Sequence, residues 1–195
     1  MEMAGLRGVS SECLEISDQE ASLQLLQLTR QLLHLCEERQ PEVIFTHPYE
    51  GGHPDHDACA FAVHHAVALV GGQMQTPPLI VESTFYHAGP NGMEAGNFLP
   101  HPSSEREIIY RLSDEERQRK QALLECFTTQ KEVLSCFKLE EERFRIAPVY
   151  DFRQRPRIGQ VFYDQFPWGM TSQRFCEIAA EVGNALQTET IGTCR

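Results

Sequence analysis

Two short apolar runs with a helical pattern between them restrict the fold of this chain more than any other feature. Residues 42–46 (Glu-Val-Ile-Phe-Thr) are rich in β-branched and aromatic side chains, and residues 79–85 form a second run of that kind. Between them, apolar residues recur at helical spacing over 57–70, and Gly71-Gly72 closes the helix. A strand, a helix and a strand in this order predict a right-handed parallel crossover.

A further helix is predicted before this unit. Ser17 and Glu20 have the spacing of a capping box, and leucines follow at helical intervals until Pro41. We therefore expect an amphipathic helix over about 18–38.

The second half of the chain continues the alternation of helices and strands. Residues 87–104 are rich in Gly, Pro and Asn and are predicted to form a loop over the carboxyl ends of the strands. Residues 107–112 favour a third strand, and Ser113 with Glu116 forms a second capping box that opens a helix to about residue 137. A strand-like run over 144–152 and a terminal helix over about 171–186 complete the pattern.

These elements predict the α/β class, with a Rossmann-like three-layer fold and a mostly parallel sheet. No internal repeat and no low-complexity linker interrupts the chain, so we expect one domain over residues 1–195. The net charge is 17 − 28 = −11, without a basic patch, which argues against nucleic acid and membrane surfaces as partners. Seven scattered cysteines without CxxC spacing favour reduced thiols, and with no signal-peptide pattern at the start they predict a cytoplasmic protein.

Five of the eight histidines lie between positions 47 and 65. The segment His-Pro-Tyr-Glu-Gly-Gly-His-Pro-Asp-His (47–56) follows the carboxyl end of a predicted strand and opens a helix, which is where open α/β sheets place ligands. We expect it to direct His53 and His56 into the crevice above the sheet. The alternative is a polar helix terminus without function. His64 and His65 lie roughly 12 Å further along the helix, too far from His56 to share a metal ion, and are interpreted as ordinary helix residues.

Residues 46–58 resemble the second sequence motif of the LmbE-like, or PIG-L, family of zinc-dependent N-deacetylases. Residues 120–130, which include Lys120 and Gln130, are similar to a helix of that family, and residues 142–170 resemble the C-terminal segment of one bacterial subgroup. The resemblance implies hydrolysis of an N-acyl, typically N-acetyl, group on a small amino-sugar conjugate of the N-acetylglucosamine type.

The resemblance also implies roles for three residues of the histidine segment. His56 matches a zinc ligand, His53 matches the residue that polarises the carbonyl or stabilises the oxyanion, and Asp55 matches a carboxylate that tunes that histidine. Such a zinc ion has three protein ligands and an open position for water. Other divalent ions such as iron or nickel suit the same donors.

The family's other motif, His-Pro-Asp-Asp, does not occur in this sequence. The remaining His-Pro pairs, at His47 and His101, are not followed by aspartates. The chain therefore resembles a family member truncated at its N-terminus, without its first one or two βα units, the general base and two of the three zinc ligands. Replacement ligands are sought among Glu50, Asp57, His87 and His101, or in a second subunit.

Three hypotheses follow from this pattern. The first is that the chain is a metal-dependent deacetylase. The second is that it is an inactive α/β remnant that serves as a binding module. The third is that the gene product is longer and that the recorded start lies inside it. An incomplete sheet would expose a strand edge and favour a homo-oligomer. Trp168 and its aromatic neighbours either wall a sugar site or pack against the terminal helix.

Overall fold

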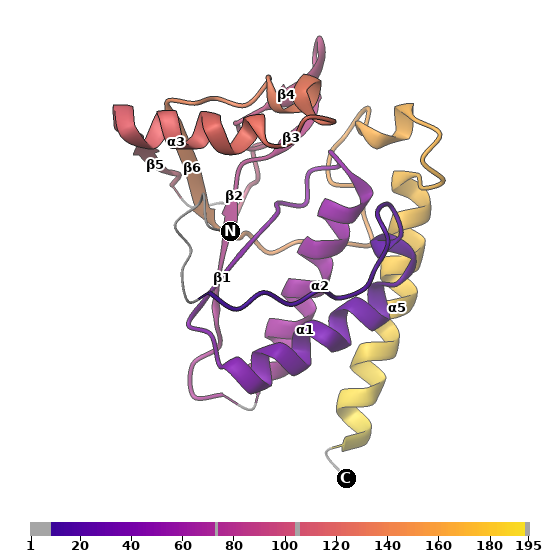
Figure 1. The fold of residues 1–195 in the computed structure, drawn as a ribbon. Coiled ribbons are helices and arrows are strands. Elements are labelled where there is room, and N and C mark those ends of the chain that lie inside the picture. The colour runs from indigo at the N-terminus through magenta and orange to yellow at the C-terminus, as the bar shows by residue number, and fades with distance from the viewer. Residues whose placement is uncertain (1–8, 73, 104–105, 194–195) are drawn as a thin grey trace.

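The computed structural model describes residues 9–72, 74–103 and 106–193, and it contains the predicted parallel unit (Figure 1). Strand β1 (Val43–Thr46) pairs in parallel with β2 (Leu79–Ser83), and helix α2 (Pro54–Val70) connects them. Val43 lies opposite Leu79, and Thr46 lies opposite Glu82. The α/β fold class is therefore confirmed.

The remaining strands join this pair in the opposite direction. The sheet order is β1-β2-β6-β5, and β6 (Glu141–Ile146) is antiparallel to both β2 and β5 (Ile108–Arg111). The expected mostly parallel sheet is thus a mixed sheet. The reason is that the segment between β5 and β6 starts at Arg111 and returns to its register partner Glu141, so the chain reverses instead of crossing over.

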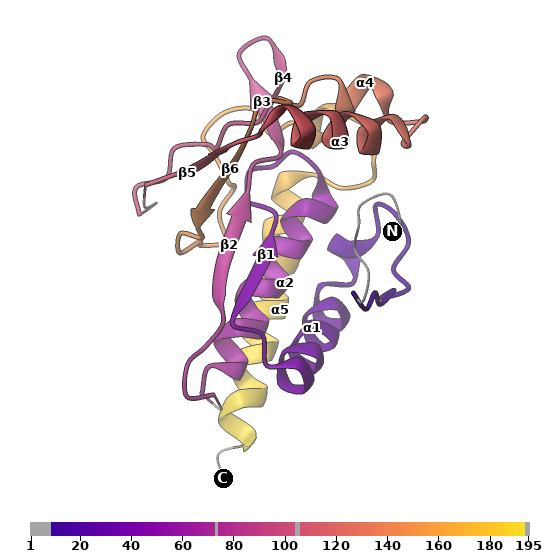
Figure 2. The same ribbon diagram turned by 60° about the vertical axis from the view of Figure 1, so that its left-hand side comes forward.

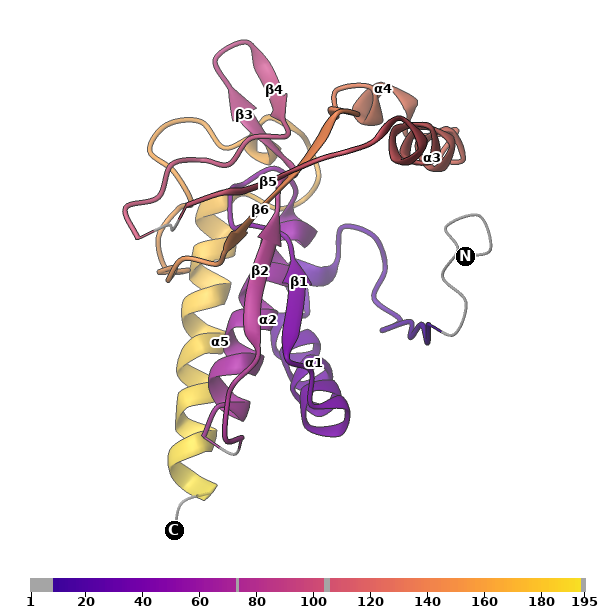
Figure 3. The same ribbon diagram turned by 90° about the vertical axis from the view of Figure 1, so that its left-hand side faces the viewer.

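The three long helices lie on the same face of β1 and β2 (Figures 2 and 3). They are α1 (Leu25–Arg39), α2 and α5 (Ser172–Thr193). On the opposite face Phe45 is 66% exposed and Val43 is 42% exposed. The expected third layer is therefore absent from the part of the chain that the structure describes, because α1 and α5 both pack against α2 instead of dividing between the two faces.

Helix α2 forms the centre of the core. Its side chains Ala58, Ala60 and Phe61 have no exposed surface, and they join a buried cluster with Leu25 of α1 and Phe175 of α5. Small alanines allow neighbouring helices to approach closely, and the Phe61 ring packs against Phe152, with 5.3 Å between the ring centroids. This packing fixes the N-terminus of α2, which carries the histidine segment.

Helix α1 begins later than expected. It starts at Leu25 behind a short 3-10 turn, η1 (Ala21–Leu23), so the predicted capping box of Ser17 and Glu20 is wrong. The carboxylate of Asp55 accepts two backbone N–H groups of the segment before α1. These long-range hydrogen bonds hold that segment in turns and replace the local cap.

The segment after β2 also differs from its prediction. A hairpin of β3 (Tyr86–Gly89) and β4 (Gly92–Ala95) replaces the start of the loop expected over 87–104. Gly92 has a φ of +115°, which a tight turn between strands needs and which only glycine adopts easily.

The predicted helix after β5 is divided in two. Ser113 and Glu116 form the predicted capping box of α3 (Asp114–Glu125), and the chain turns before the short helix α4 (Lys131–Leu134). A 3-10 turn, η2 (Tyr163–Gln165), precedes α5. Among the described residues, the cysteines carry free thiols and no helix is both long and apolar enough to cross a lipid bilayer.

We predict that Phe61→Ala lowers the free energy of unfolding by about 3–5 kcal/mol, because it removes a fully buried ring and leaves a cavity. Phe45→Ala is the matched control on the exposed face of the sheet, and it should cost less than about 1 kcal/mol. Denaturant unfolding followed by circular dichroism measures both. Equal losses would contradict the assignment of the core to the helical face.

Candidate functional site

The histidine segment forms a tight loop between β1 and α2, and its two glycines have no room for a side chain. Gly51 has a φ of +71°, and a Cβ atom there would lie 2.6 Å from Val161. A Cβ on Gly52 would lie 1.9 Å from the carbonyl oxygen of Tyr86. Any other residue at these positions would push the loop away from the hairpin and from the segment before α5.

The buried carboxylate of Asp57 fixes the backbone of this loop. Its Oδ1 accepts the N–H groups of Gly51, at 3.0 Å, and Glu50, at 3.3 Å. Its Oδ2 accepts the hydroxyl of Tyr163 at 3.1 Å. Asp57 is fully buried, so these bonds stabilise the backbone of the loop in a site where an unpaired donor would be costly.

His53 is the N-cap residue of α2. Its Nδ1 accepts the backbone N–H of Asp55 at 3.2 Å, so in the neutral ring the proton is on Nε2. Burial lowers the pKa of His53, although Asp55 and Asp18 oppose this effect. The neutral ring lies against Trp168, with 5.0 Å between the ring centroids, and presents an N–H donor to the adjoining pocket.

His56 lies one turn further along α2 and stacks on His47. Their ring centroids are 4.3 Å apart and their planes differ by 12°. Burial and the neighbouring histidines hold the pKa of His56 well below its usual value, and burial lowers that of His47 to about 4. Nδ1 of His56 is buried and has no hydrogen-bond partner. Both rings are therefore neutral at pH 7, and His56 retains an unpaired ring nitrogen.

Asp55 connects the site to the N-terminal segment. Its carboxylate accepts the N–H groups of Gln19, at 2.7 Å, and Ala21, at 3.1 Å, while its own N–H contacts His53. The carboxylate thus acts on His53 through its charge and not through a hydrogen bond. The tuning role that the sequence predicts for Asp55 stays a prediction.

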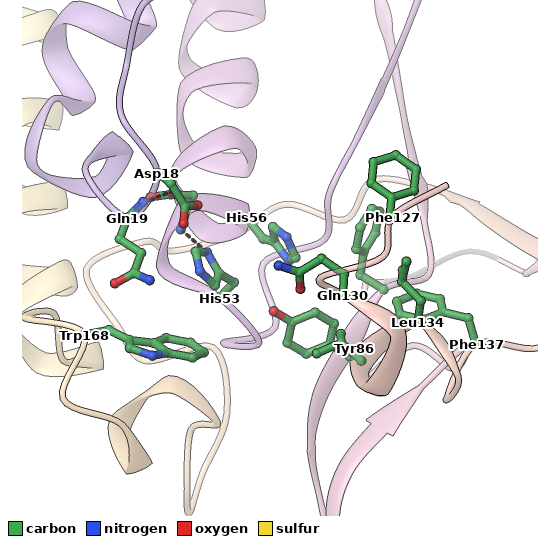
Figure 4. Close-up of a pocket in the computed structure, with 13 residues that line it drawn as sticks. Asp18, Gln19, His53, His56, Tyr86, Phe127, Gln130, Leu134, Phe137 and Trp168 are labelled. Atoms are coloured by element: carbon green, nitrogen blue, oxygen red, sulfur yellow. Dashed lines mark hydrogen bonds between the residues drawn. The ribbon is translucent and has the colours of Figure 1, made fainter. Parts of the chain in front are cut away.

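These residues line one side of a pocket of about 440 Å³ (Figure 4). His53 and His56 lie at its centre, and the hydroxyl of Tyr86 and the amide of Gln130 point toward them. The remaining lining residues are Asp18, Gln19, Asp55, Phe85, Phe127, Val133, Leu134, Phe137 and Trp168. Trp168 therefore belongs to the pocket as well as to an aromatic stack with Phe166.

A buried ionic network lies behind the loop. Arg145 of β6 donates to Glu82 of β2 at 2.8 Å and to Glu50 of the loop at 3.3 Å. The hydroxyl of Tyr150 accepts from Arg145 and donates to Glu82. Burial raises the pKa of Glu50 to about 8, although Arg145 opposes this shift. One positive charge thus faces two carboxyl groups in the interior, and Glu50 is the group that stays protonated.

The residues that the structure describes do not form a zinc site. No group of three His, Cys, Asp or Glu side chains among them is placed to hold a metal ion. Of the predicted replacement ligands, Glu50 pairs with Arg145, and Asp57 is hydrogen-bonded to the loop and to Tyr163. Nδ1 of His56, Nε2 of His64 and Nε2 of His87 are buried and have no hydrogen-bond partner among the described residues, but none of them belongs to a group of three ligands, and a single ligand is not sufficient for zinc.

His64 and His65 are placed in α2 as the sequence predicts, away from the pocket. The ring of His65 stacks on Phe61, with 4.0 Å between centroids, and hydrogen-bonds the Phe61 carbonyl oxygen. His64 packs against Tyr150. Both contribute to helix packing.

Several pocket residues are not evident from the sequence as site residues. Tyr86 begins the hairpin, between the strand predicted over 79–85 and the loop predicted over 87–104. Asp18 lies in a segment that the sequence predicts to be helical, and the sequence marks Gln130 only by its resemblance to a family position. Their positions depend on long-range contacts. The Pro90-Asn91-Gly92 turn is the one local signal that predicts the hairpin.

Fold and site together define an α/β protein with a pocket centred on two neutral histidines at the carboxyl end of a parallel strand. Residues 2–67 match the model of the PIG-L family, described as GlcNAc-PI de-N-acetylase, and this match supports the family resemblance predicted from the sequence. The match covers about a third of the chain and includes the whole histidine loop. No solved structure gives a significant match.

The raised pKa of Glu50 predicts a pH-dependent stability. Between its unfolded value of 4.5 and its native value of about 8, Glu50 binds a proton in the native state that the unfolded chain has lost. Native stability therefore falls as the pH rises through this window, by at most about 1.4 kcal/mol per pH unit for one group. Glu50→Gln should flatten this slope in denaturant unfolding, whereas Glu37→Gln, at an exposed position, should not. An unchanged slope in Glu50→Gln would contradict the protonated state.

The same site makes a prediction about metal content. The described residues include no group of three metal ligands. We therefore expect purified protein that has been dialysed against a zinc solution to retain well below one zinc ion per chain, as measured by elemental analysis. One tightly bound zinc per chain that is lost in His56→Ala, but not in His34→Ala, would contradict this expectation.

Proposed function

We propose that the pocket binds the N-acyl group of an amino-sugar conjugate for deacetylation. The observation that carries the proposal is the tautomer of His53. Because Nδ1 accepts the N–H of Asp55, the ring proton is on Nε2, in a side chain that lines the pocket. A fixed, neutral N–H donor is suited to an amide carbonyl oxygen and to the oxyanion that develops from it.

The other polar groups of the pocket support amide recognition. The hydroxyl of Tyr86 and the amide of Gln130 point toward the two histidines and offer both donors and acceptors to a sugar. The indole of Trp168 beside His53 suits the apolar face of a sugar ring. The family match independently favours a deacetylase-type activity, and an N-acetylglucosamine substrate is the finer part of this proposal.

A non-catalytic binding module is the second candidate. The observation that favours it is the lack of a three-ligand metal group among the described residues. In this case the pocket holds the amide through His53 but releases it unchanged. The role of His53 in recognition is the same in both candidates.

We predict that His53→Ala lowers kcat/KM for deacetylation of an N-acetylglucosaminide by about 10²–10³-fold, because it removes the donor to the oxyanion. His34→Ala, at an exposed position of α1, should leave kcat/KM unchanged. Acetate release measures both variants in the presence of zinc.

Two outcomes would contradict parts of the proposal. Equal activity of His53→Ala and wild type would remove the assigned role of His53. Wild-type acetate release at the buffer rate with zinc, iron and nickel would exclude the enzyme and leave the binding module, which still predicts amide binding that His53→Ala abolishes.

A further inference from the structure

The pocket has a polar centre and a large apolar wall. Figure 4 shows the two histidines, Tyr86 and Gln130 facing one another, with Leu134, Phe127 and Phe137 beyond them. Val133 and Phe85 complete this wall. An acetamido group occupies only the polar centre, so the apolar wall has to contact another part of the ligand.

The apolar wall is held in place by the structure. Phe137 contacts the rings of Phe85 and Tyr86, with centroids 6.1 and 6.4 Å away. The wall comes mainly from the turn after α3 and from α4, which project from the sheet and do not join the helical core of α1, α2 and α5. Its apolar side chains therefore face the pocket and not the protein interior.

The charged residues that line the pocket are all acidic. Its charged lining residues among those described are Asp18 and Asp55, with no lysine or arginine.

Cationic side chains on nearby segments bind elsewhere. Arg157 donates to the carbonyl oxygen of Ala88. Lys138 donates to Asn97 at 3.1 Å and pairs with Glu141. A phosphate in the pocket would thus face carboxylates without a described cation to compensate them.

We propose that the pocket selects N-acyl conjugates whose remaining part is apolar and uncharged, and that it disfavours phosphorylated conjugates. The inference rests on the proposed function for the amide end and adds the chemistry of the other end. The apolar part lies against Leu134 and Phe137, and Asp18 repels anions at the polar side.

Trp168 is the only tryptophan of the chain and lines the pocket, so its fluorescence reports binding without requiring turnover. The probes are the octyl and methyl glycosides of N-acetylglucosamine and its 1-phosphate, each below any micelle-forming concentration. Each buried methylene strengthens binding about fourfold. We expect the octyl glycoside to bind at least about tenfold more tightly than the methyl glycoside, and the 1-phosphate at least about tenfold more weakly.

Two pairs of variants locate these effects. Leu134→Ala should reduce the ratio of octyl to methyl affinity, while Ile158→Ala, at a fully exposed position, should leave it unchanged. Asp18→Asn should narrow the gap between the methyl glycoside and the 1-phosphate, while Glu37→Gln, which removes the same charge elsewhere, should not. A ratio of two affinities measured on the same variant does not change when a fraction of that protein is unfolded.

The outcomes separate this inference from the proposed function. Equal binding of octyl and methyl glycosides, an unchanged ratio in Leu134→Ala, or a 1-phosphate that binds as tightly as the methyl glycoside would overturn the inference alone. Octyl glucoside, which lacks the amide, tests whether the pocket recognises the N-acyl end of the ligand. If it binds as tightly as the octyl N-acetylglucosaminide, the proposed amide recognition is wrong, whereas the proposed contact of the apolar wall with the ligand is retained. No saturable change with any probe would overturn both.

Discussion

The hydrogen bonds that Asp57 accepts from the loop before α2 are the interactions on which the site depends. A fully buried carboxylate fixes the N–H groups of Glu50 and Gly51 and the hydroxyl of Tyr163, and thereby joins the end of β1 to the segment before α5. The backbone can then turn tightly enough for Gly52 to contact the hairpin. The place of His53 at the N-terminus of α2 follows from this turn, and its ring tautomer follows from that place.

Burial determines the protonation states around this loop. His47, His53 and His56 are neutral because their surroundings disfavour the imidazolium form. Glu50 is protonated at pH 7 because burial raises its pKa to about 8, although Arg145 opposes this shift. The result is a pocket with neutral donors at its centre, carboxylates at one side and apolar side chains at the other. Such a pocket suits a neutral amide better than an anion.

The local parts of the structure could be predicted from the sequence, and the long-range parts could not. The strand at 43–46, the helix that starts at Pro54 and the Ser113 capping box follow from patterns within a few residues. The predicted Ser17 box is wrong because Asp55, in the first turn of α2, accepts the N–H groups of Gln19 and Ala21 and holds this segment in turns. The predicted direction of the later strands is wrong because it depends on where the chain returns to the sheet after α4.

In the site, too, the local parts could be predicted from the sequence and the long-range parts could not. The places of His53 and His56 could be predicted from the motif, since both follow from a strand, two glycines and a helix start. The positions of Trp168, more than a hundred residues away, and of Tyr86 and Gln130 depend on how the hairpin and the segments after β5 and β6 fold back over α2. No local pattern encodes these contacts.

The most direct test of the site is the ring tautomer of His53, measured by nitrogen NMR of protein labelled in its histidines. Assignment by loss of the signal in His53→Ala identifies the residue. The structure predicts a neutral ring at pH 7 with its proton on Nε2, and a change of the Nε2 signal when an N-acetylglucosaminide binds. A proton on Nδ1, a charged ring, or an Nε2 signal that does not respond to the ligand would contradict the assigned site.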